Sequence, residues 1–371
     1  MDSQELQAWL RLTLSPGVGN AASRKLLAAF GSAQAIFDQS PATLRQLGSE
    51  KLASALLTEP PALAAQLQST LDWLQAGDDR RVVALGDAAY PPELLDIEDP
   101  PLMLYMLGTL AHQAQAATKP KAIKLAIVGS RNPTPQGEAN ARQFAKAFGS
   151  AGLCVVSGLA LGIDGAAHDG AMLGGGDTIA VVGTGLDRVY PKKHLALAHR
   201  IAQQGMLLSE FPLGTPPLMA NFPKRNRIIS GLSRGTLVIE AALQSGSLIT
   251  ARLALEQGKE VFAIPGSIHS PQSRGCHALI KQGAKLVEVA QDVLEELNLP
   301  MTALSADDSD TAAPSSDPLL EALGFDAVSL DALQARTGLD TARLQAQLLD
   351  LELNGQVARL PGGLFQRLAA G

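Results

Sequence analysis

Short apolar runs alternate with amphipathic segments along the middle of the chain, from residue 124 to residue 287. The apolar runs are continuous, and several end at glycine: KLAIVGS, LCVVSG, DTIAVVGTG, MLLSEFP, RGTLVIEA and EVFAIPGS. The segments between them, such as QGEANARQFAKAFGSAG, have helical periodicity. Strands that are apolar on both faces and are joined by helices form parallel sheets with helices on both sides. The pattern therefore predicts an α/β domain whose ligands bind at the carboxyl ends of the strands.

The segments on either side predict two smaller domains. Residues 1–75 carry Leu and Ala at spacings of three and four, which indicates helices. Residues 299–318 are rich in Ala, Ser, Asp, Thr and Pro, as in a flexible linker. Residues 319–371 show three helical segments and a hairpin with a Pro-Gly-Gly turn, which indicate a winged helix. The expected order is a helical domain, a central domain over residues 76–298, a linker and a winged helix.

The helical domain contains a tight turn, SPGVGNAASRKLLAAFG, that is similar to one helix-hairpin-helix unit. In such units the N–H groups of the turn hold a DNA phosphate at a helix N-terminus. The competing interpretation is a plain helical hairpin, and we favour it because the segment is acidic.

The net charge of −6 conceals a basic segment. Residues 1–120 carry 8 Lys and Arg against 13 Asp and Glu, and residues 299–371 carry 4 against 10. Residues 121–298 carry 18 against 13, a net charge of +5. This asymmetry favours an anionic ligand for the central domain, and it argues against unaided DNA binding by either end. For the acidic winged helix we favour contacts with proteins over contacts with DNA.

Several classes of protein are not expected. Cys154 and Cys276 lack metal-binding or redox spacing, so reduced thiols in a cytoplasmic protein are expected. No apolar run approaches membrane-spanning length, and the first residues show no signal-peptide pattern. The six histidines are dispersed, so neither a metal nor a cofactor is expected. A Walker motif and a dinucleotide-binding GxGxxG with its later acidic residue are both absent.

The most informative stretch is FPKRNRIISGLSRG, residues 222–235. It combines a Phe-Pro bend with Lys224, Arg225 and Arg227 around Asn226, and no Asp or Glu lies between Phe211 and Ile239. Such a cluster among Gly-rich loops suits a polyphosphate. The competing interpretation is a solvated turn with ordinary surface cations.

Other loops at strand ends can extend such a site. Each has an ordinary structural interpretation, such as a turn, a helix cap or a packed side chain. Together they supply small residues, cations and three candidate acid–base groups: Gly129, Ser130, Arg131, Ser157, Gly158, Asp164, His168, Lys192, Lys193, Glu240, Ser245, Gly246 and Ser247. Because these loops follow parallel strands, they are expected to converge on one edge of the sheet.

The ordered motifs AIVGSR, SGLALGID, FPKRNRIISGLS, EAALQSGSLITARLALEQGKEVFAIPGS and GCHALIKQGA resemble those of the DprA family, also called Smf. The resemblance covers roughly residues 80–298. It implies an extended Rossmann-like domain that binds single-stranded DNA. It also implies protection of incoming strands, loading of the recombinase RecA past single-strand-binding protein, a homodimer, and no enzymatic activity.

The resemblance also implies a set of DNA-binding residues. They are Gly129, Ser130, Arg131, Ser157, Gly158, Lys192, Lys224, Arg225, Asn226, Arg227, Ser245, Gly246 and Ser247. Phe222 either stacks on a base or anchors the bend as a buried aromatic residue. For the dimer, Ala290, Val293, Leu294 and Leu297 have helical spacing. They form either an exposed stripe that pairs with its copy or part of the chain's own core.

Two other functions stay open. The broad fold superfamily includes nucleotide phosphoribohydrolases with a PGGxGT-xxE loop. Here the corresponding segment, SGLSRGTLVIEA, keeps Gly235, Thr236 and Glu240 but lacks the Pro-Gly-Gly, which counts against hydrolysis. The third possibility is a protein adaptor whose working part is the winged helix.

Overall fold

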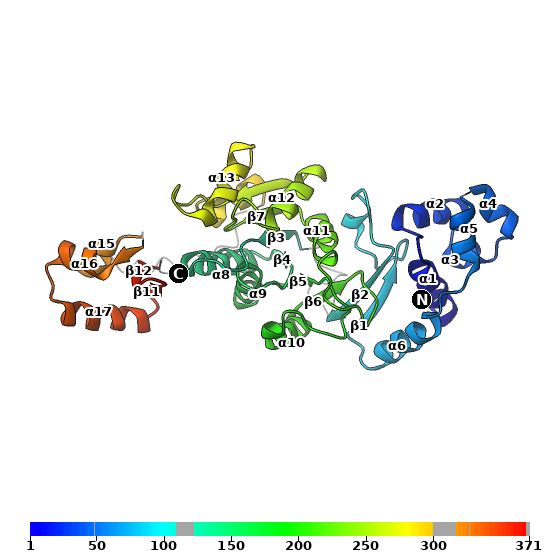
Figure 1. The fold of residues 1–371 in the computed structure, drawn as a ribbon, viewed down its shortest axis with the longest axis horizontal. Coiled ribbons are helices and arrows are strands. Elements are labelled where there is room, and N and C mark those ends of the chain that lie inside the picture. Colours follow the sequence, from blue (N-terminus) through cyan, green and yellow to red (C-terminus); the bar gives the residue numbers. More distant parts are fainter. Residues whose placement is uncertain (48, 109–121, 300–316, 326, 369–371) are drawn as a thin grey trace.

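The computed structural model describes residues 1–47, 49–108, 122–299, 317–325 and 327–368. Figure 1 shows the N-terminal helices at one end, a large sheet with its helices in the middle and a small domain at the other end. Most of the expected linker lies outside the described residues.

In the described residues, the central sheet has nine strands in the order β1-β2-β6-β5-β4-β3-β7-β8-β9. Strands β3 to β9 are parallel, and β1 and β2 form an antiparallel edge that pairs with β6. The strands are β1 Arg80–Ala84, β2 Met103–Gly108, β3 Lys124–Val128, β4 Cys154–Ser157, β5 Thr178–Val181, β6 Met206–Ser209, β7 Gly235–Val238, β8 Glu260–Ala263 and β9 Lys285–Leu286. The predicted parallel α/β sheet is confirmed, with an antiparallel extension at one edge.

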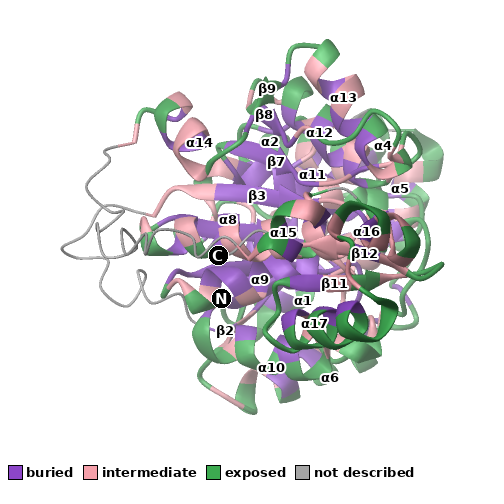
Figure 2. Cartoon of the chain, turned by 90° about the vertical axis from the view of Figure 1, so that its left-hand side faces the viewer, coloured by how far each residue is buried: buried purple, intermediate pink, exposed green. Residues whose placement is uncertain are grey.

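Helices cover both faces of this sheet. One face carries α8 Pro135–Ser150, α9 Ile163–Leu173, α10 Leu195–Gln204 and α14 Ala290–Glu296. The other carries α11 Asn221–Leu232, α12 Ser247–Glu256 and α13 Arg274–Lys281. Short 3-10 turns at Pro92–Leu94, Lys192–His194 and Pro271–Ser273 complete the domain. Figure 2 shows β3 and β7 buried between the two helix layers.

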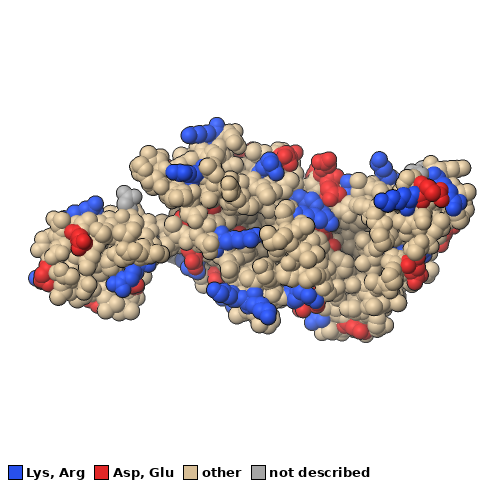
Figure 3. Space-filling view, viewed as in Figure 1, with Lys and Arg blue, Asp and Glu red and all other residues tan. Residues whose placement is uncertain are grey.

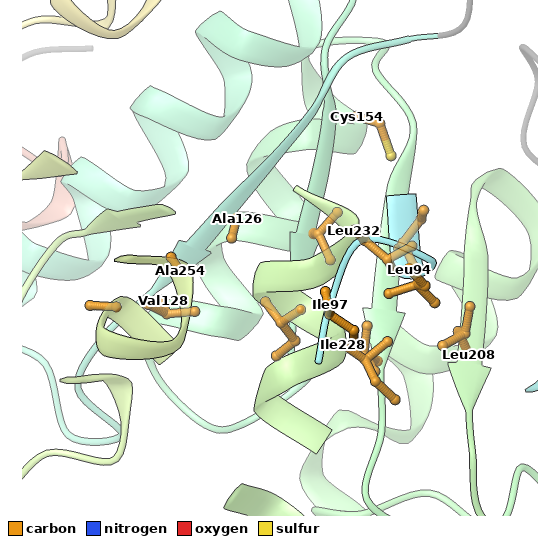
Figure 4. Packing of buried hydrophobic residues seen from close by; sticks show 14 of the residues in the cluster. Leu94, Ile97, Ala126, Val128, Cys154, Leu208, Ile228, Leu232 and Ala254 are labelled. Carbon is orange, nitrogen blue, oxygen red and sulfur yellow. The ribbon is translucent and has the colours of Figure 1, made fainter. Parts of the chain in front are cut away.

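The central strand β3 shows why its sequence is apolar after its first residue, Lys124. Leu125 and Ile127 point into the core under α8 and α9, whereas Ala126 and Val128 point into the core under α11 and α12. Successive side chains of a strand point to opposite faces, so a strand covered on both sides has no polar positions. Figure 4 shows Ala126 and Val128 on the α11 side, in the same core as Ile228 and Leu232 of α11.

Helix α11 differs from the expected Phe-Pro bend. The basic segment is a helix from its first residues, and Pro223 lies in the first turn. Proline is tolerated there because the first N–H groups of a helix have no partner within the helix. The apolar pair Ile228 and Ile229 is buried on the sheet, which fixes the position of the helix.

The N-terminal segment is helical, as predicted. Its helices are α1 Ser3–Leu14, α2 Asn20–Phe30, α3 Ala33–Phe37, α4 Pro41–Leu47, α5 Glu50–Leu57 and α6 Leu63–Gln75. Their core is continuous with the outer face of the antiparallel edge, because Val82 and Tyr105 belong to the same cluster as Leu10 and Trp73. The edge strands therefore join the helices to the large sheet.

The C-terminal segment has the predicted three helices and a hairpin. The elements are α15 Pro318–Leu323, β10 Val328–Ser329, α16 Leu330–Thr337, α17 Thr341–Leu353, β11 Val357–Leu360 and β12 Leu364–Arg367. The two-residue strand β10 was not expected, and it joins the hairpin in the order β10-β12-β11. This arrangement is a winged helix with its own core around Leu333 and Leu344.

The stripe considered for a dimer contact lies on and just after α14. Val293, Leu294 and Leu297 are at most 2% exposed and pack with Phe148 and Phe262 of the same chain. The exposed stripe that a dimer contact would need is therefore not found at these three residues, and packing on the chain's own sheet accounts for their spacing.

Candidate functional site

A pocket of about 440 Å³ opens at the carboxyl ends of β3 and β7. These strands are neighbours, but the helices that follow them, α8 and α12, cover opposite faces of the sheet. Loops that diverge in this way leave a crevice, where α/β proteins bind their ligands. The pocket is lined by residues 128–132, Ala160, Asp164, Met219, Phe222, Pro223, Arg225, Asn226, Ile229, Ala242, residues 244–247, Ile249, Thr250 and Gln272.

The wall formed by α11 carries Arg225, which is only 5% exposed. Its Nη1 donates to the carbonyl oxygen of Val181 at the end of β5, at 3.0 Å. A Cβ on Gly158 would lie 1.5 Å from that Nη1, so the absence of a side chain there is what admits the guanidinium. The Nε of Arg225 has no hydrogen-bond partner among the described residues. Buried donors usually have a hydrogen-bond partner, so this nitrogen is an exception in the pocket wall.

Asp164 lies in the same wall. Its Oδ2 accepts hydrogen bonds from the N–H groups of Gly158 and Ala160, at 3.0 and 3.3 Å. Burial raises the pKa of Asp164, while Arg225 and these N–H groups oppose the rise. Burial also disfavours the charged form of Arg225 and lowers its pKa to about 10, still well above neutral pH. The arginine therefore keeps its charge, and Asp164 partly neutralises it.

Arg131, which follows β3, is exposed and is the cation on the open side of the pocket. Its guanidinium carbon is 5.7 Å from the ring centre of Phe222. The Phe222 ring in turn lies 5.7 Å from that of Tyr190, with the two planes tilted by 36°. Phe222 is half-buried rather than fully packed. The Arg131 guanidinium thus lies over the Phe222 ring, and both residues line the pocket.

The third wall is the loop from Ser245 to Ser247 at the start of α12. The hydroxyl groups of Ser245 and Ser247 are 2.7 Å apart, and Asn226 of α11 donates to the carbonyl oxygen of Gly246 at 3.4 Å. Gly246 precedes the helix without capping it through a side chain. The positive end of the α12 dipole therefore faces the pocket, which favours an anion.

The structure brings together most of the residues that the sequence singled out, but not all of them. Ser157 is fully buried, and its Oγ donates to the carbonyl oxygen of Ile127 at 2.6 Å, so it supports the pocket floor. Lys192 is exposed in a short 3-10 turn and is not among the lining residues.

Lys224 and Arg227 lie on the other side of α11. Arg227 is 10% exposed in its side chain and pairs with Glu210, which is 4% exposed, and Lys224 lies 3.5 Å from the same carboxylate. Figure 3 shows Lys and Arg gathered over α11, with Asp and Glu beside them toward the N-terminal helices. These two cations face protein carboxylates, which fits neither the solvated turn nor the phosphate site expected for the segment.

Two candidate acid–base groups serve the structure. Glu240 accepts from both the N–H and the hydroxyl of Thr134, whose Oγ1 caps α8. Burial raises the pKa of Glu240, and the bonds from Thr134 oppose this. His168 is fully buried, and Nδ1 lies 2.7 Å from Thr178 Oγ1. Burial, with smaller contributions from His194 and Arg225, lowers the pKa of His168 to about 3. Neither side chain lines the pocket.

Several lining residues were not found from the sequence. Asn132 and Gln272 are linked by a hydrogen bond from Gln272 Nε2 to the Asn132 carbonyl oxygen, at 3.2 Å. Met219, 82% exposed, lies just before α11. Gln272 belongs to the loop after β8. Because all parallel strands of the sheet end on one edge, that loop was a candidate on topology alone.

Within the described ranges, no three His, Cys, Asp or Glu side chains are placed to hold a metal ion. Nor is any helix there both long and apolar enough to cross a membrane.

Three family models match the chain. The model for DNA recombination-mediator protein A matches residues 81–298, the DprA winged helix domain matches 292–363, and the DprA-like N-terminal HHH domain matches 3–59. The first of these alone spans more than half of the chain.

Individual relatives agree with these models. Protein Smf of Escherichia coli K12 is 42% identical over 338 residues, which cover 88% of this chain and 86% of that protein. DNA processing protein DprA of Streptococcus pneumoniae is 48% identical over 210 residues, covering 57% of this chain and 72% of that one.

Two solved structures are similar in fold. The X-ray structure of DprA from S. pneumoniae has a TM-score of 0.62 at 36% identity and covers 80% of this chain and 98% of that chain. A structure describing the single-stranded DNA binding mode of DNA processing protein A from Helicobacter pylori has a TM-score of 0.51 at 30% identity, with 59% and 96% covered. With its helical N-terminal domain, its pocketed α/β domain and its winged helix, the chain belongs to the DprA/Smf family.

Proposed function

We propose that the pocket binds single-stranded DNA, and that the protein protects incoming strands and loads RecA onto them during natural transformation and homologous recombination. The observation that carries the proposal is the joint placement of Arg131, Arg225 and the α12 N-terminus around one crevice beside the Phe222 ring.

The chemistry of these groups suits a sugar–phosphate backbone. Arginine stays charged at neutral pH and presents a planar set of donors that matches phosphate oxygens. Arg225 and Arg131 both line the pocket, and Arg131 is exposed. The helix N-terminus adds a fixed partial positive charge. Two or more phosphates can be neutralised without moving the backbone.

The same pocket can hold bases without distinguishing among them. The half-buried Phe222 ring offers a stacking surface, worth about 1–3 kcal/mol per base. Every base has such a face, so stacking tolerates any sequence. A protein that receives arbitrary incoming strands needs this tolerance.

The partners and the absence of catalysis rest on family membership. We include RecA, single-strand-binding protein, a homodimer, a cytoplasmic location and the lack of enzymatic activity and cofactor in the proposal. The H. pylori relative, whose structure describes a single-stranded DNA binding mode, supports the ligand. Light scattering of the purified protein tests the dimer.

The test of the pocket is oligo-dT binding, measured by fluorescence anisotropy at several salt concentrations. Arg131→Ala and Arg225→Ala are each expected to weaken binding by about 10-fold or more, since each removes a charge-assisted contact. Arg131→Ala also reduces the slope of log affinity against log salt, by about 0.7 for one lost phosphate contact.

The matched control is Arg142→Ala. Arg142 is a partly exposed arginine of α8 that pairs with Glu138 and does not line the pocket. Its loss removes the same charge and leaves affinity nearly unchanged. If Arg131→Ala and Arg225→Ala also bind normally at moderate salt, this pocket is not the DNA site.

A further inference from the structure

The outer side of α11 is connected to the N-terminal helices through one carboxylate, Asp99. Its Oδ1 accepts a hydrogen bond from Arg24 Nη1 at 2.5 Å, and its Oδ2 accepts one from Asn20 Nδ2 at 3.3 Å. The same Oδ2 lies 3.3 Å from Nε of Arg227. Asn20 and Arg24 belong to α2, whereas Arg227 belongs to α11. We call Asn20, Arg24, Asp99 and Arg227 the Asp99 bridge.

On the sheet side, the bridge ends in a buried ion pair. Arg227 also binds Glu210, the residue after β6, and these side chains are 10% and 4% exposed. Burial raises the pKa of Glu210, and the cations Arg227 and Lys224 oppose the rise. A buried charge that loses its partner is costly, so Arg227 cannot move away from both carboxylates. The position of α11 is therefore tied to Asp99 and Glu210.

The same helix carries the pocket wall. Arg225 lies two residues before Arg227, and Phe222 and Asn226 also face the pocket from α11. Arg225 has little room to adjust independently, because its guanidinium is held between Gly158 and the carbonyl oxygen of Val181. A small shift of α11 at Arg227 therefore displaces the pocket contacts as a unit.

We infer that Asp99 is a positioning residue that couples helix α2 of the N-terminal domain to the DNA pocket through α11. The inference rests on the proposed function, since it assigns a second element to the control of that same site. Asp99 is not among the residues that line the pocket, and it acts through Arg227. Asn20 directly follows the Gly17–Gly19 turn, so a partner that binds this turn also acts on the Asp99 bridge.

Coupling of this kind is reciprocal. If the arrangement of α2 favours the pocket geometry that binds DNA, then bound DNA must stabilise α2 to the same extent. A residue that only stabilises the fold has no such effect on a distant helix once the protein is folded.

The experiment uses the full chain, with Asp99→Asn as the variant and Glu98→Gln as the matched control. Glu98 is exposed on the same loop and contributes only its carbonyl oxygen to Arg24, so its side-chain charge is outside the bridge. Oligo-dT affinity is measured by anisotropy against salt. Amide hydrogen exchange of residues 20–30 is measured with and without saturating oligo-dT.

Asp99→Asn is expected to weaken oligo-dT binding about fivefold, the low end of typical coupling, because Asp99 is 39% exposed. The salt slope stays at the wild-type value, since no phosphate contact is lost. Oligo-dT slows exchange in α2 of the wild type and of Glu98→Gln, but not of Asp99→Asn.

Arg24→Ala is a second variant that breaks the Asp99 bridge, here from α2. Its effect matches that of Asp99→Asn, and the double variant is no weaker than either single one. The inference is overturned if both single variants bind oligo-dT with wild-type affinity. It is also overturned if oligo-dT does not change the rate of amide exchange in α2 of the wild type. Wild-type protein that fails to bind oligo-dT overturns the proposed function instead.

Discussion

The two sides of α11 use the same residue type in opposite ways. On the pocket side, Arg225 lines the pocket and faces a single partly compensating carboxylate, Asp164. On the outer side, Arg227 is enclosed by two carboxylates, Glu210 and Asp99. The first arginine belongs to the wall of the proposed DNA site, whereas the second forms ion pairs that hold the helix in place.

The difference shows that a basic sequence motif does not reveal how many of its charged side chains are available to bind a ligand. The cluster around Asn226 contributes three cations, yet Lys224 and Arg227 lie near protein carboxylates and only Arg225 of the three lines the pocket. The positive field at the pocket comes from Arg131, Arg225 and a helix end more than from the run of cations.

The largest expected effect is on stability, at the outer side. Arg227→Ala leaves Glu210 buried without its main partner, which costs roughly 3–5 kcal/mol in the free energy of unfolding. Urea denaturation followed by circular dichroism measures it, with Arg142→Ala as the surface control, expected to cost less than about 0.5 kcal/mol. If Arg227→Ala lost no more stability than Arg142→Ala, the outer side of α11 would not hold the helix in place as described.

The next effect is on binding, at the pocket side. Gly158→Ala places a Cβ 1.5 Å from Nη1 of Arg225, so the guanidinium must leave its position. Oligo-dT affinity is expected to fall about 10- to 100-fold although no charge has changed. The double variant with Arg225→Ala should bind no worse than Arg225→Ala alone in anisotropy titrations. Additive losses would mean that Gly158 acts on DNA by another route.

The smallest effect concerns Lys224, which is 46% exposed and 3.5 Å from Glu210. Lys224→Ala is expected to change oligo-dT affinity less than about threefold and stability by less than about 1 kcal/mol. Parallel titrations of Lys224→Ala and Arg131→Ala decide the point. Equal losses would indicate that the strand also passes over the outer side of α11.

Much of the fold is predictable because it depends on local periodicity. The continuous apolar runs require burial on both faces, and a parallel sheet is the arrangement that provides it. The antiparallel pairing of β2 with β6 was not predictable, since it depends on contacts between segments about 100 residues apart.

The basic segment shows what local reasoning missed. Pro223 suggested a bend, but a proline in the first turn leaves a helix intact. Residues two apart on a helix are separated by about 200°, so a helix would have placed Arg225 and Arg227 on different sides. Had the segment been predicted as a helix, the sequence alone would have placed these two arginines on different sides of it.

The spacing of Val293, Leu294 and Leu297 was correctly taken as helical, but spacing does not reveal which surface the helix meets. Their burial under the sheet is a property of the tertiary fold. For the same reason Gln272, which is far along the chain from β3, was not associated with the pocket.

The unequal exposure of Arg131 and Arg225 has a kinetic consequence. An exposed charge acts over roughly a Debye length, about 10 Å at 0.1 M salt, and so accelerates encounter with a polyanion. Arg225, buried beside Asp164, contributes little field outside the protein and acts only after contact. Under the proposed function, we therefore expect Arg131→Ala to slow the capture of a strand and Arg225→Ala to speed its release.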